Sequence, residues 1–394
     1  MTKPYFPRRT RLANGCRSIA LALFISGCGV APNLGNSQSG TAADLAEMGR
    51  VYALVPNERD ADALRSAAMD LNYTVTAEVD LPALDLIMVP IDLPDGVSGA
   101  QAIEALEADV PTSTVGVNHA YRLQSSASPA ARRNYATAML DWPASGCMAK
   151  TSLGLIDGGV DTRAPALRDA RVVQQQFGNG SRSAMRHGTE VASVLADPAR
   201  LRGVELYSAN VISSGPGGGD MAGAASIVQA LDWLAGQDVR IVNISLAGPF
   251  NKLLAQAVEA ASDTGMVMVA AAGNDRRIAP LQYPAALPSV VAVTAVDAQG
   301  EVMETAVRGS HIDFAAPGVD IFVTSSFGQR YVTGTSMAAP FVTMRFATNG
   351  DMRREALIAD AIDLGPSGKD EVFGHGLVQA SGACAKPIAD IPSN

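Results

Sequence analysis

The sequence has 394 residues, which is long enough for one large domain or for two of ordinary size. Hydrophobic residues make up 47% of the chain and charged residues 18%, proportions that are typical of a folded α/β protein and exclude a disordered one. The formal net charge is −9, and no basic stripe follows the N-terminal segment. This charge balance argues against nucleic acid as a partner.

The first 27 residues have the order of an export signal. Several arginines stand near the start, an apolar stretch follows over 19–25, and two small residues precede Cys28. The ending Ile-Ser-Gly-Cys28 resembles the lipobox of bacterial lipoproteins, with a plain secretory signal as the alternative. The resemblance implies a protein that is exported, carries lipid on Cys28 and is anchored to a bacterial membrane facing the periplasm or the cell surface.

Two cysteines are left once Cys16 of the signal and Cys28 are set aside. Cys147 stands just before the second folded unit of the chain, and Cys384 stands near the end of that unit. In an oxidising compartment such a pair can form a disulfide. We therefore predict a Cys147–Cys384 bond that joins the two ends of the domain, with two free thiols as the alternative.

Residues 28–48 predict a flexible tether, because they include a run rich in Gly, Ser and Asn without an apolar period. Residues 49–123 predict a compact α+β unit. Its expected strands are 51–56, 73–79, 84–90 and 112–117, and its expected helices are 60–71 and 98–108. The order β-α-β-β-α-β predicts a small ferredoxin-like sandwich. Residues 124–147 are mostly polar and predict a linker.

From residue 148 to residue 385, apolar runs alternate with helical stretches. This alternation predicts an α/β domain with a doubly wound, mostly parallel sheet. The expected strands are 153–156, 206–212, 239–244, 265–271 and 290–295. The expected helices are 187–195, 221–234, 252–264 and 336–346. Residues 386–394 predict a C-terminal tail, and no transmembrane helix is expected after the signal.

Three segments of this domain place a reactive side chain at the carboxyl end of a strand or at the start of a helix, where such sheets collect their active sites. An apolar strand ends at Asp157 and is followed by two glycines. His187 starts a helix in the run Arg-His-Gly-Thr-Glu, and Ser336 opens another in Gly-Thr-Ser-Met-Ala-Ala-Pro. Taken singly, these are ordinary features: a turn aspartate, a structural histidine and an N-cap serine.

Together the segments resemble the subtilase family, whose members carry their catalytic residues in the chain order Asp, His, Ser. The resemblance covers about 152–377 and implies a subtilisin-like serine endopeptidase with the triad Asp157, His187 and Ser336. In that triad, His187 takes the proton of the Ser336 hydroxyl and Asp157 orients the imidazole. The alternative is a catalytically silent lipoprotein of the same fold that binds peptides or partner proteins.

The resemblance also implies an oxyanion site made by the Asn274 side chain and the backbone N–H of Ser336. The family's substrate-binding strand, which pairs with an extended peptide, corresponds to Ser245, Leu246, Ala247 and Gly248. A wall of the primary specificity pocket corresponds to Ala271, Ala272 and Gly273. Small side chains in this wall favour large apolar or aromatic residues in protein or peptide substrates.

We expect no cofactor and no metal site. No carboxylate cluster suggests the calcium sites of many subtilases, and His119, His311 and His375 have no second ligand at a usual spacing. The resemblance further implies that residues 49–123 are a prodomain, which inhibits the domain intramolecularly until the chain cleaves itself within 124–147. Because this cleavage would part the domain from a lipid on Cys28, a permanent N-terminal domain is the alternative.

Overall fold

The computed structural model describes residues 45–123, 126–128, 135–178, 181–215, 219–276, 280–349, 352–380 and 384, all within one compact unit, 37–394. The export signal, Cys28, most of the tether and the tail 386–394 lie outside the described residues. None of the helices in the described part of the chain is long and apolar enough to cross a membrane. Two parts are distinguished below: the N-terminal unit, 49–117, and the main domain, which begins at 148.

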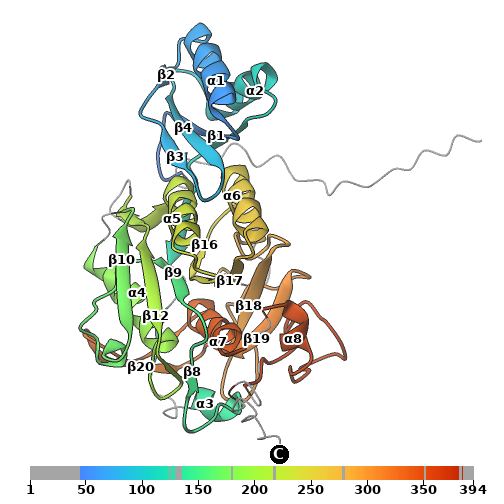
Figure 1. The fold of residues 1–394 in the computed structure, drawn as a ribbon. Coiled ribbons are helices and arrows are strands. Elements are labelled where there is room, and N and C mark those ends of the chain that lie inside the picture. Colours follow the sequence, from blue (N-terminus) through green and yellow to red (C-terminus); the bar gives the residue numbers. More distant parts are fainter. Residues whose placement is uncertain are drawn as a thin grey trace, which may run out of the picture. The chain divides into compact units, whose positions relative to one another are not determined.

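In the N-terminal unit, two helices cover one face of an antiparallel sheet (Figure 1). The elements are β1 (Arg50–Val55), α1 (Glu58–Asp70), β2 (Thr74–Val75), β3 (Val79–Leu81), β4 (Leu86–Asp92), α2 (Gly99–Asp109) and β5 (Thr114–Val117). The strands are hydrogen-bonded in the order β2-β4-β1-β5, and β3 also pairs with β4. The helices begin where the sequence supplies caps: Asn57 caps α1, and Ser98 with Gln101 forms a capping box at α2.

The main domain contains a parallel sheet of seven strands in the order β10-β12-β9-β15-β17-β18-β19. These strands are β9 (Leu153–Asp157), β10 (Arg171–Gln176), β12 (Glu205–Asn210), β15 (Ile241–Ile244), β17 (Val267–Ala271), β18 (Val290–Val296) and β19 (Ile312–Pro317). The sequence patterns did not predict β10 and β19. Both lie at the edges of the sheet: β10 is exposed there and carries three glutamines in a row, whereas β19 is buried and includes Asp313, which pairs with Arg354 and Lys369.

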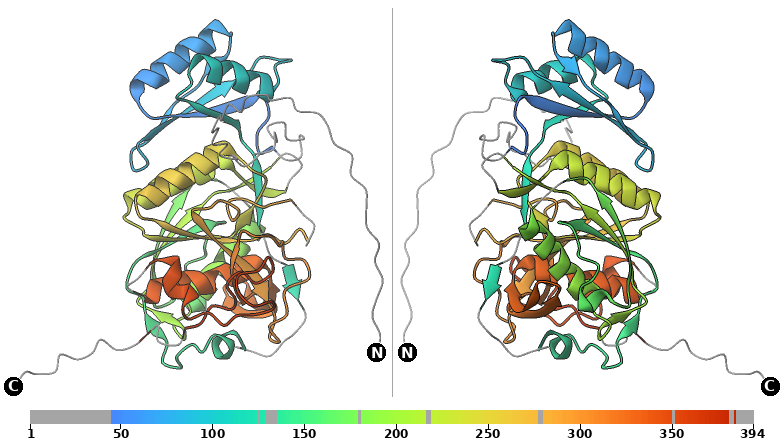
Figure 2. Two further views of the ribbon diagram at one scale, coloured as in Figure 1. Left: turned by 90° about the vertical axis from the view of Figure 1, so that its right-hand side faces the viewer. Right: turned by 90° about the vertical axis from the view of Figure 1, so that its left-hand side faces the viewer.

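Helices cover both faces of this sheet (Figure 2). On one face lie α4 (Arg182–Leu195) and α7 (Thr335–Thr348), and on the other lie α5 (Ala224–Gly236) and α6 (Lys252–Asp263). The short helix α8 (Arg354–Ile358) follows α7. The prediction that a helix starts at His187 is wrong, because α4 begins at Arg182 and carries His187 in its second turn. Ser336 is the second residue of α7, behind the N-cap Gly334.

Two small sheets connect the region after the N-terminal unit to the main domain. The first has the order β13-β14-β6-β16, and the second has the order β20-β21-β7. Their strands are β6 (Ala120–Leu123), β13 (Ile212–Ser214), β14 (Asp220–Gly223), β16 (Leu246–Ala247), β7 (Ser126–Ser128), β20 (Ile321–Ser325) and β21 (Gly328–Thr333). Thus β6, which the sequence assigned to the N-terminal unit, pairs only with strands of the main domain.

The segment 124–147, expected to be a plain linker, contributes regular elements. It holds β7 and α3 (Tyr135–Met139), and β8 (Cys147–Met148) pairs with β11 (Leu201–Arg202). The Tyr135 hydroxyl donates to the carbonyl of Val319 at 2.6 Å, which fixes α3 on the main domain. The structure also joins Cys147 to Cys384, with Cα atoms 5.3 Å apart, so that the start and the end of the domain are held together.

Candidate active site

Asp157 and His187 meet because glycines let α4 approach the loop after β9. A Cβ atom on Gly158 would collide with the carbonyl of Ala184, and one on Gly188 would collide with the carbonyl of Gly158. The close approach sets the Asp157 carboxylate, which is fully buried at the carboxyl end of β9, against the imidazole of His187. The N–H of Gly158 also donates to Asp157 Oδ1 at 2.5 Å.

Three side chains from β9, α4 and α7 form one hydrogen-bonded chain. His187 Nδ1 lies 2.8 Å from Asp157 Oδ1, and His187 Nε2 lies 3.2 Å from Ser336 Oγ. All three residues are at least 95% buried. An imidazole held at one nitrogen by a carboxylate, with the other nitrogen on a hydroxyl, is suited to accept the hydroxyl proton as the oxygen attacks.

Pro340 explains why Ser245 lies behind the Ser336 backbone. A proline has no N–H, so the carbonyl of Ser336, four residues earlier in α7, lacks its helical donor. The Ser245 hydroxyl donates to that carbonyl at 3.2 Å and accepts from the Asn243 side chain at 2.8 Å. Asn243 in turn accepts from the Thr343 hydroxyl at 3.0 Å. The side chain of Ser245, predicted as a substrate contact, is therefore engaged within the protein.

Asn274 is oriented by the residue before Ser336. Its Oδ1 accepts from the N–H of Thr335 at 3.1 Å and from the Thr335 hydroxyl at 2.9 Å. The Thr335 hydroxyl oxygen also accepts from the N–H of Gly273 at 3.1 Å. These bonds turn the donor end of the Asn274 amide away from Thr335. The sequence analysis did not predict a role for Thr335 or Asn243, although Thr335 adjoins Ser336 and Asn243 lies two residues before Ser245.

An ion pair between a buried glutamate and a partly exposed arginine fixes the strand that leads to Ser336. Glu190 of α4 is fully buried and accepts two bonds from Arg330 of β21, at 2.6 and 2.7 Å. The bonds to this carboxylate raise the pKa of Arg330 above its usual value. Because the pair is bidentate, it sets both the distance and the direction between α4 and β21.

The predicted substrate strand accepts a strand of the chain itself. β6 pairs antiparallel with β16, with Leu123 opposite Leu246 and Arg122 opposite Ala247. On its other edge β6 pairs with β14, where Tyr121 lies opposite Ala222. The Tyr121 side chain is fully buried, and its hydroxyl donates to the carbonyl of Pro249 at 3.1 Å. Burial raises the pKa of Tyr121 far above its usual value.

The remaining predicted wall residues lie at the end of β17. Ala271 and Ala272 are fully buried, and Gly273 has a φ of +105° that only glycine adopts readily. A Cβ atom there would meet Gln282. This wall therefore stays close to the start of α7 through the bond between Gly273 and Thr335.

The other histidines lie away from the triad. Among the described residues no three His, Cys, Asp or Glu side chains are grouped as metal ligands would be. His119 is buried beside Asn251, at 3.1 Å between Nδ1 and Nδ2. Burial lowers the pKa of His311 and of His375 below the usual value.

Comparison with known proteins identifies the architecture that carries this site. The model of the family described as Subtilase family matches residues 149–376. The chain belongs to this family. It contains a subtilisin-like serine endopeptidase domain, which is the class of the family and of its curated relatives.

Two relatives and one solved structure show the range of the similarity. Minor extracellular protease Epr of Bacillus subtilis is 35% identical over 213 residues, which are 49% of this chain and 32% of that protein. Subtilisin DY of Bacillus licheniformis is 31% identical over 265 residues, which are 60% of this chain and 91% of that protein. The structure of fervidolysin from Fervidobacterium pennivorans shares the fold with a TM-score of 0.71 at 21% identity, over 90% of this chain and 63% of that one. This subtilase chain thus spans about a third of the length of Epr.

Proposed function

We propose that the chain is a serine endopeptidase that cleaves proteins outside the cytoplasm, with Asp157, His187 and Ser336 as its triad. The observation that supports this most is the unbroken hydrogen-bond chain from the buried carboxylate through the imidazole to the hydroxyl. A second support is β16, which already pairs with an extended segment as it would with a substrate.

In the proposed reaction, Ser336 Oγ attacks the scissile carbonyl carbon while its proton passes to His187 Nε2. The carbonyl oxygen becomes negative and takes hydrogen bonds from the Asn274 amide and the N–H of Ser336. The C–N bond then breaks, the leaving amine takes the proton from His187, and an acyl-enzyme remains. Water then attacks the ester carbonyl carbon while His187 takes its proton; the C–O bond to Ser336 breaks, the acid leaves, and Ser336 Oγ takes the proton back from His187. Asp157 holds the imidazole and stabilises it while it is charged.

We propose also that the N-terminal unit is a prodomain that occupies and blocks this site. Its continuation β6 lies where a substrate strand would lie, and β7 pairs with β21 beyond it. Leu123 is opposite Leu246, whereas Ser126 is opposite Thr333, three residues before Ser336. We therefore narrow the expected self-cleavage from the range 124–147 to a bond between Leu123 and Ser126.

Export and lipid attachment at Cys28 remain proposals that rest on the sequence. The name of Epr, an extracellular protease, agrees with export. If Cys28 carries lipid, the wild-type chain will fractionate with membranes and a Cys28→Ser chain will not. After self-cleavage the main domain can stay near the membrane only through its contacts with the N-terminal unit.

Intact-mass analysis of the signal-free protein over time tests the proposal, with wild type beside Ser336→Ala and the control Ser367→Ala, which changes an exposed serine. We expect wild type and the control to lose a fragment that ends between Leu123 and Ser126, and Ser336→Ala to stay whole. If all three stay whole but a fluorophosphonate probe labels Ser336, the unit is a permanent domain. If labelling also fails, the chain is a silent binder of peptides.

A further inference from the structure

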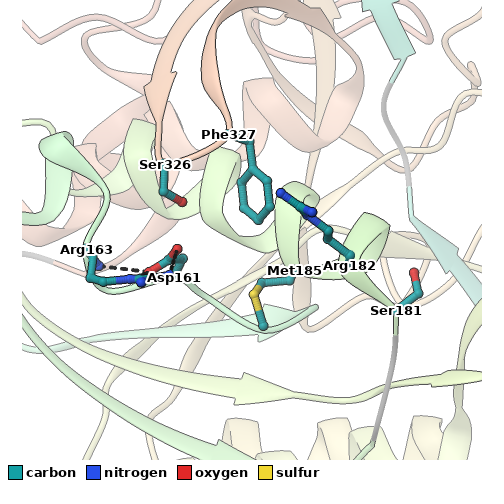
Figure 3. A pocket seen from close by; sticks show the side chains of 7 residues that line it. All are labelled: Asp161, Arg163, Ser181, Arg182, Met185, Ser326 and Phe327. Carbon is teal, nitrogen blue, oxygen red and sulfur yellow. Dashed lines mark hydrogen bonds and ion pairs between the residues drawn. The ribbon is translucent and has the colours of Figure 1, made fainter.

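A cavity with two arginines and one aspartate in its wall lies at the first turns of α4, the helix that carries His187. Its volume is about 590 Å³, and it lies between the first turns of α4, the loop after β9 and the turn that joins β20 to β21. Figure 3 shows Phe327 of that turn pointing toward Arg182 and Met185 of α4, with Arg163 on the far side. Met185 is 41% exposed, so the cavity offers apolar surface to a ligand.

The charges of this cavity do not cancel. Arg163 is committed to Asp161 by two hydrogen bonds of 2.8 Å, and this pairing holds the pKa of the Asp161 carboxyl well below its usual range. Arg182 and Arg186 have no such partner: no carboxylate of the described residues lies within 4.0 Å of either guanidinium. Arg182 therefore brings an unpaired positive charge to the wall of the cavity, and Arg186, which is not part of that wall, brings a second one close to the ring of Phe327, which is.

The guanidinium groups of Arg182 and Arg186 both lie near the aromatic ring of Phe327. Arg182 lies 5.7 Å and Arg186 lies 5.6 Å from the centroid of Phe327. The ring attracts each cation, and an anion bound against Phe327 would be attracted by both of them. The carboxylate of Asp220, in β14, accepts hydrogen bonds from the N–H and the hydroxyl of Ser181, at 3.2 and 2.5 Å, and pairs with neither of these two arginines.

The path of a bound peptide leads toward this cavity. β7 runs antiparallel to β21, with Ser126 opposite Thr333 and Ser128 opposite Tyr331. A chain that continues in this direction moves away from Ser336 and toward Phe327, at the start of β21. The four residues from Tyr331 to Phe327 span about 13 Å at the rise of an extended strand. Residues on the C-terminal side of a scissile bond would thus reach the cavity a few positions further along.

The hairpin that carries Phe327 is held in place by the core. Arg330, three residues after Phe327, makes its bidentate pair with the buried Glu190. Because Glu190 and Arg186 stand one turn apart on α4, the same helix that carries the two cations also anchors the hairpin. The cavity is therefore preorganised and does not need a ligand to assemble it.

We propose that this cavity is a specificity subsite for an acidic side chain of a protein substrate, on the C-terminal side of the scissile bond. Arg182 in the cavity wall supplies the charge, reinforced by Arg186 over the ring of Phe327, and Phe327 and Met185 contact the methylene groups of the bound residue. Glutamate fits this combination better than aspartate, because its longer stem reaches across the apolar surface. The inference rests on the proposed endopeptidase activity and names a preference of that same site.

Internally quenched peptides test the subsite. The peptides share one sequence and carry either Glu or Gln at single positions from the second to the eighth residue after the scissile bond. At low salt we expect wild type to cleave one or two of the Glu peptides about 3–10 times more efficiently than their Gln partners, measured as kcat/KM, since exposed ion pairs contribute modestly. In 1 M salt the ratio of the two kcat/KM values should fall toward one, because the charges are screened.

The double variant Arg182→Gln/Arg186→Gln should lose the preference, whereas Arg202→Gln, which changes an exposed arginine on β11, should keep it. The proposal is overturned if the ratio of kcat/KM for the Glu peptide to that for the Gln peptide is the same in the double variant and in wild type. It is also overturned if this ratio is one at every position in wild type. If wild type cleaves neither peptide, the endopeptidase proposal fails separately. The subsite is then decided by fluorescence anisotropy of the same peptides with the wild-type protein, which leaves them intact, and equal affinity for Glu and Gln peptides overturns it.

Discussion

Two strands, β1 of the N-terminal unit and β9 of the main domain, are buried on both faces, but by different partners. In β9, Leu155 packs in the core beneath α4 and α7, and Ile156 packs beneath α5 and α6, so both covers belong to its own domain. In β1, Ala53 packs with α1 and α2 of its own unit, whereas Leu54 belongs to the core of α5 and α6. The N-terminal unit thus completes its burial only on the main domain.

Polar contacts reinforce this shared face. Asp232 of α5 accepts from the N–H groups of Ala83 and Leu84, at 2.8 and 3.2 Å, in the turn before β4. Asn251, the N-cap of α6, donates to the carbonyl of Val117 at 2.6 Å. The helices α5 and α6 therefore cover the parallel sheet and also contact the N-terminal unit, whose continuation β6 pairs with β16.

The largest effect should arise on the main-domain side, from Asp157→Asn. The amide cannot stabilise a charged imidazole or hold the same tautomer, so we expect kcat to fall about 10⁴-fold. Both units should keep their circular dichroism, because the change is nearly isosteric. Asp169→Asn, on an exposed aspartate, is the control and should retain wild-type turnover. A tenfold loss or less in Asp157→Asn would contradict the proposed triad.

Two neighbouring residues of β4 face opposite sides of the N-terminal sheet, so substituting each one tests the packing on one side at a time. Met88 packs with α5 and α6, and Val89 packs with α1 and α2. Each truncation to alanine should cost about 2–4 kcal/mol. In the Ser336→Ala background, hydrogen exchange should speed up at both the β4 face and α5 in Met88→Ala, but only within the N-terminal unit in Val89→Ala. Identical exchange patterns would mean that the two faces are not independent.

The pH dependence of the contact between the N-terminal unit and the main domain should depend on Asp232 of α5. Burial raises the pKa of this carboxyl in the docked state, so docking takes up a proton. Docking should therefore tighten as the pH falls from neutrality through the raised pKa toward the unperturbed value of about 3.9. The measurement is the urea midpoint of the N-terminal unit in Ser336→Ala between pH 4 and pH 7. Asp232→Asn should remove the part of the pH dependence that a docked carboxyl contributes.

The smallest effect should come from His311 in the main domain, and it has the opposite sign. Burial lowers the pKa of His311 despite the nearby Asp313, so the unfolded chain takes up the proton first. Stability is lost as the pH falls through about 6.5 toward the lowered folded value. Replacing His311 by Gln should flatten the fall in Tm between pH 7.5 and pH 5.5 by about 1–2 °C. No change in slope would show that His311 does not contribute.

Most regular elements followed from local patterns. The expected strands 153–156 and 290–295 match β9 and β18 closely, because a parallel strand buried on both faces has a continuous apolar run. Helix α2 starts at its predicted cap, since Ser98 and Gln101 satisfy the first backbone donors within the segment itself. The edge strands β10 and β19 escaped prediction for different reasons. The polar residues of β10 reflect its exposure, whereas Asp313 in the buried β19 bonds Arg354, a distant residue, at 3.2 Å.

By itself the sequence determined the order of the reactive residues and placed Asp157 at the end of a strand and Ser336 in the first turn of a helix, because each depends on a few neighbouring positions, whereas it placed His187 at a helix start that the structure moves to Arg182. Only the tertiary structure decided which surfaces meet. It gave β6 to the main domain, placed Ser245 behind Ser336, and gathered Arg182 and Arg186 around Phe327. These contacts join residues from about 90 to 145 positions apart, and no local period encodes them. They arise because burying apolar surface brings distant segments together, and their polar groups must then find partners where they meet.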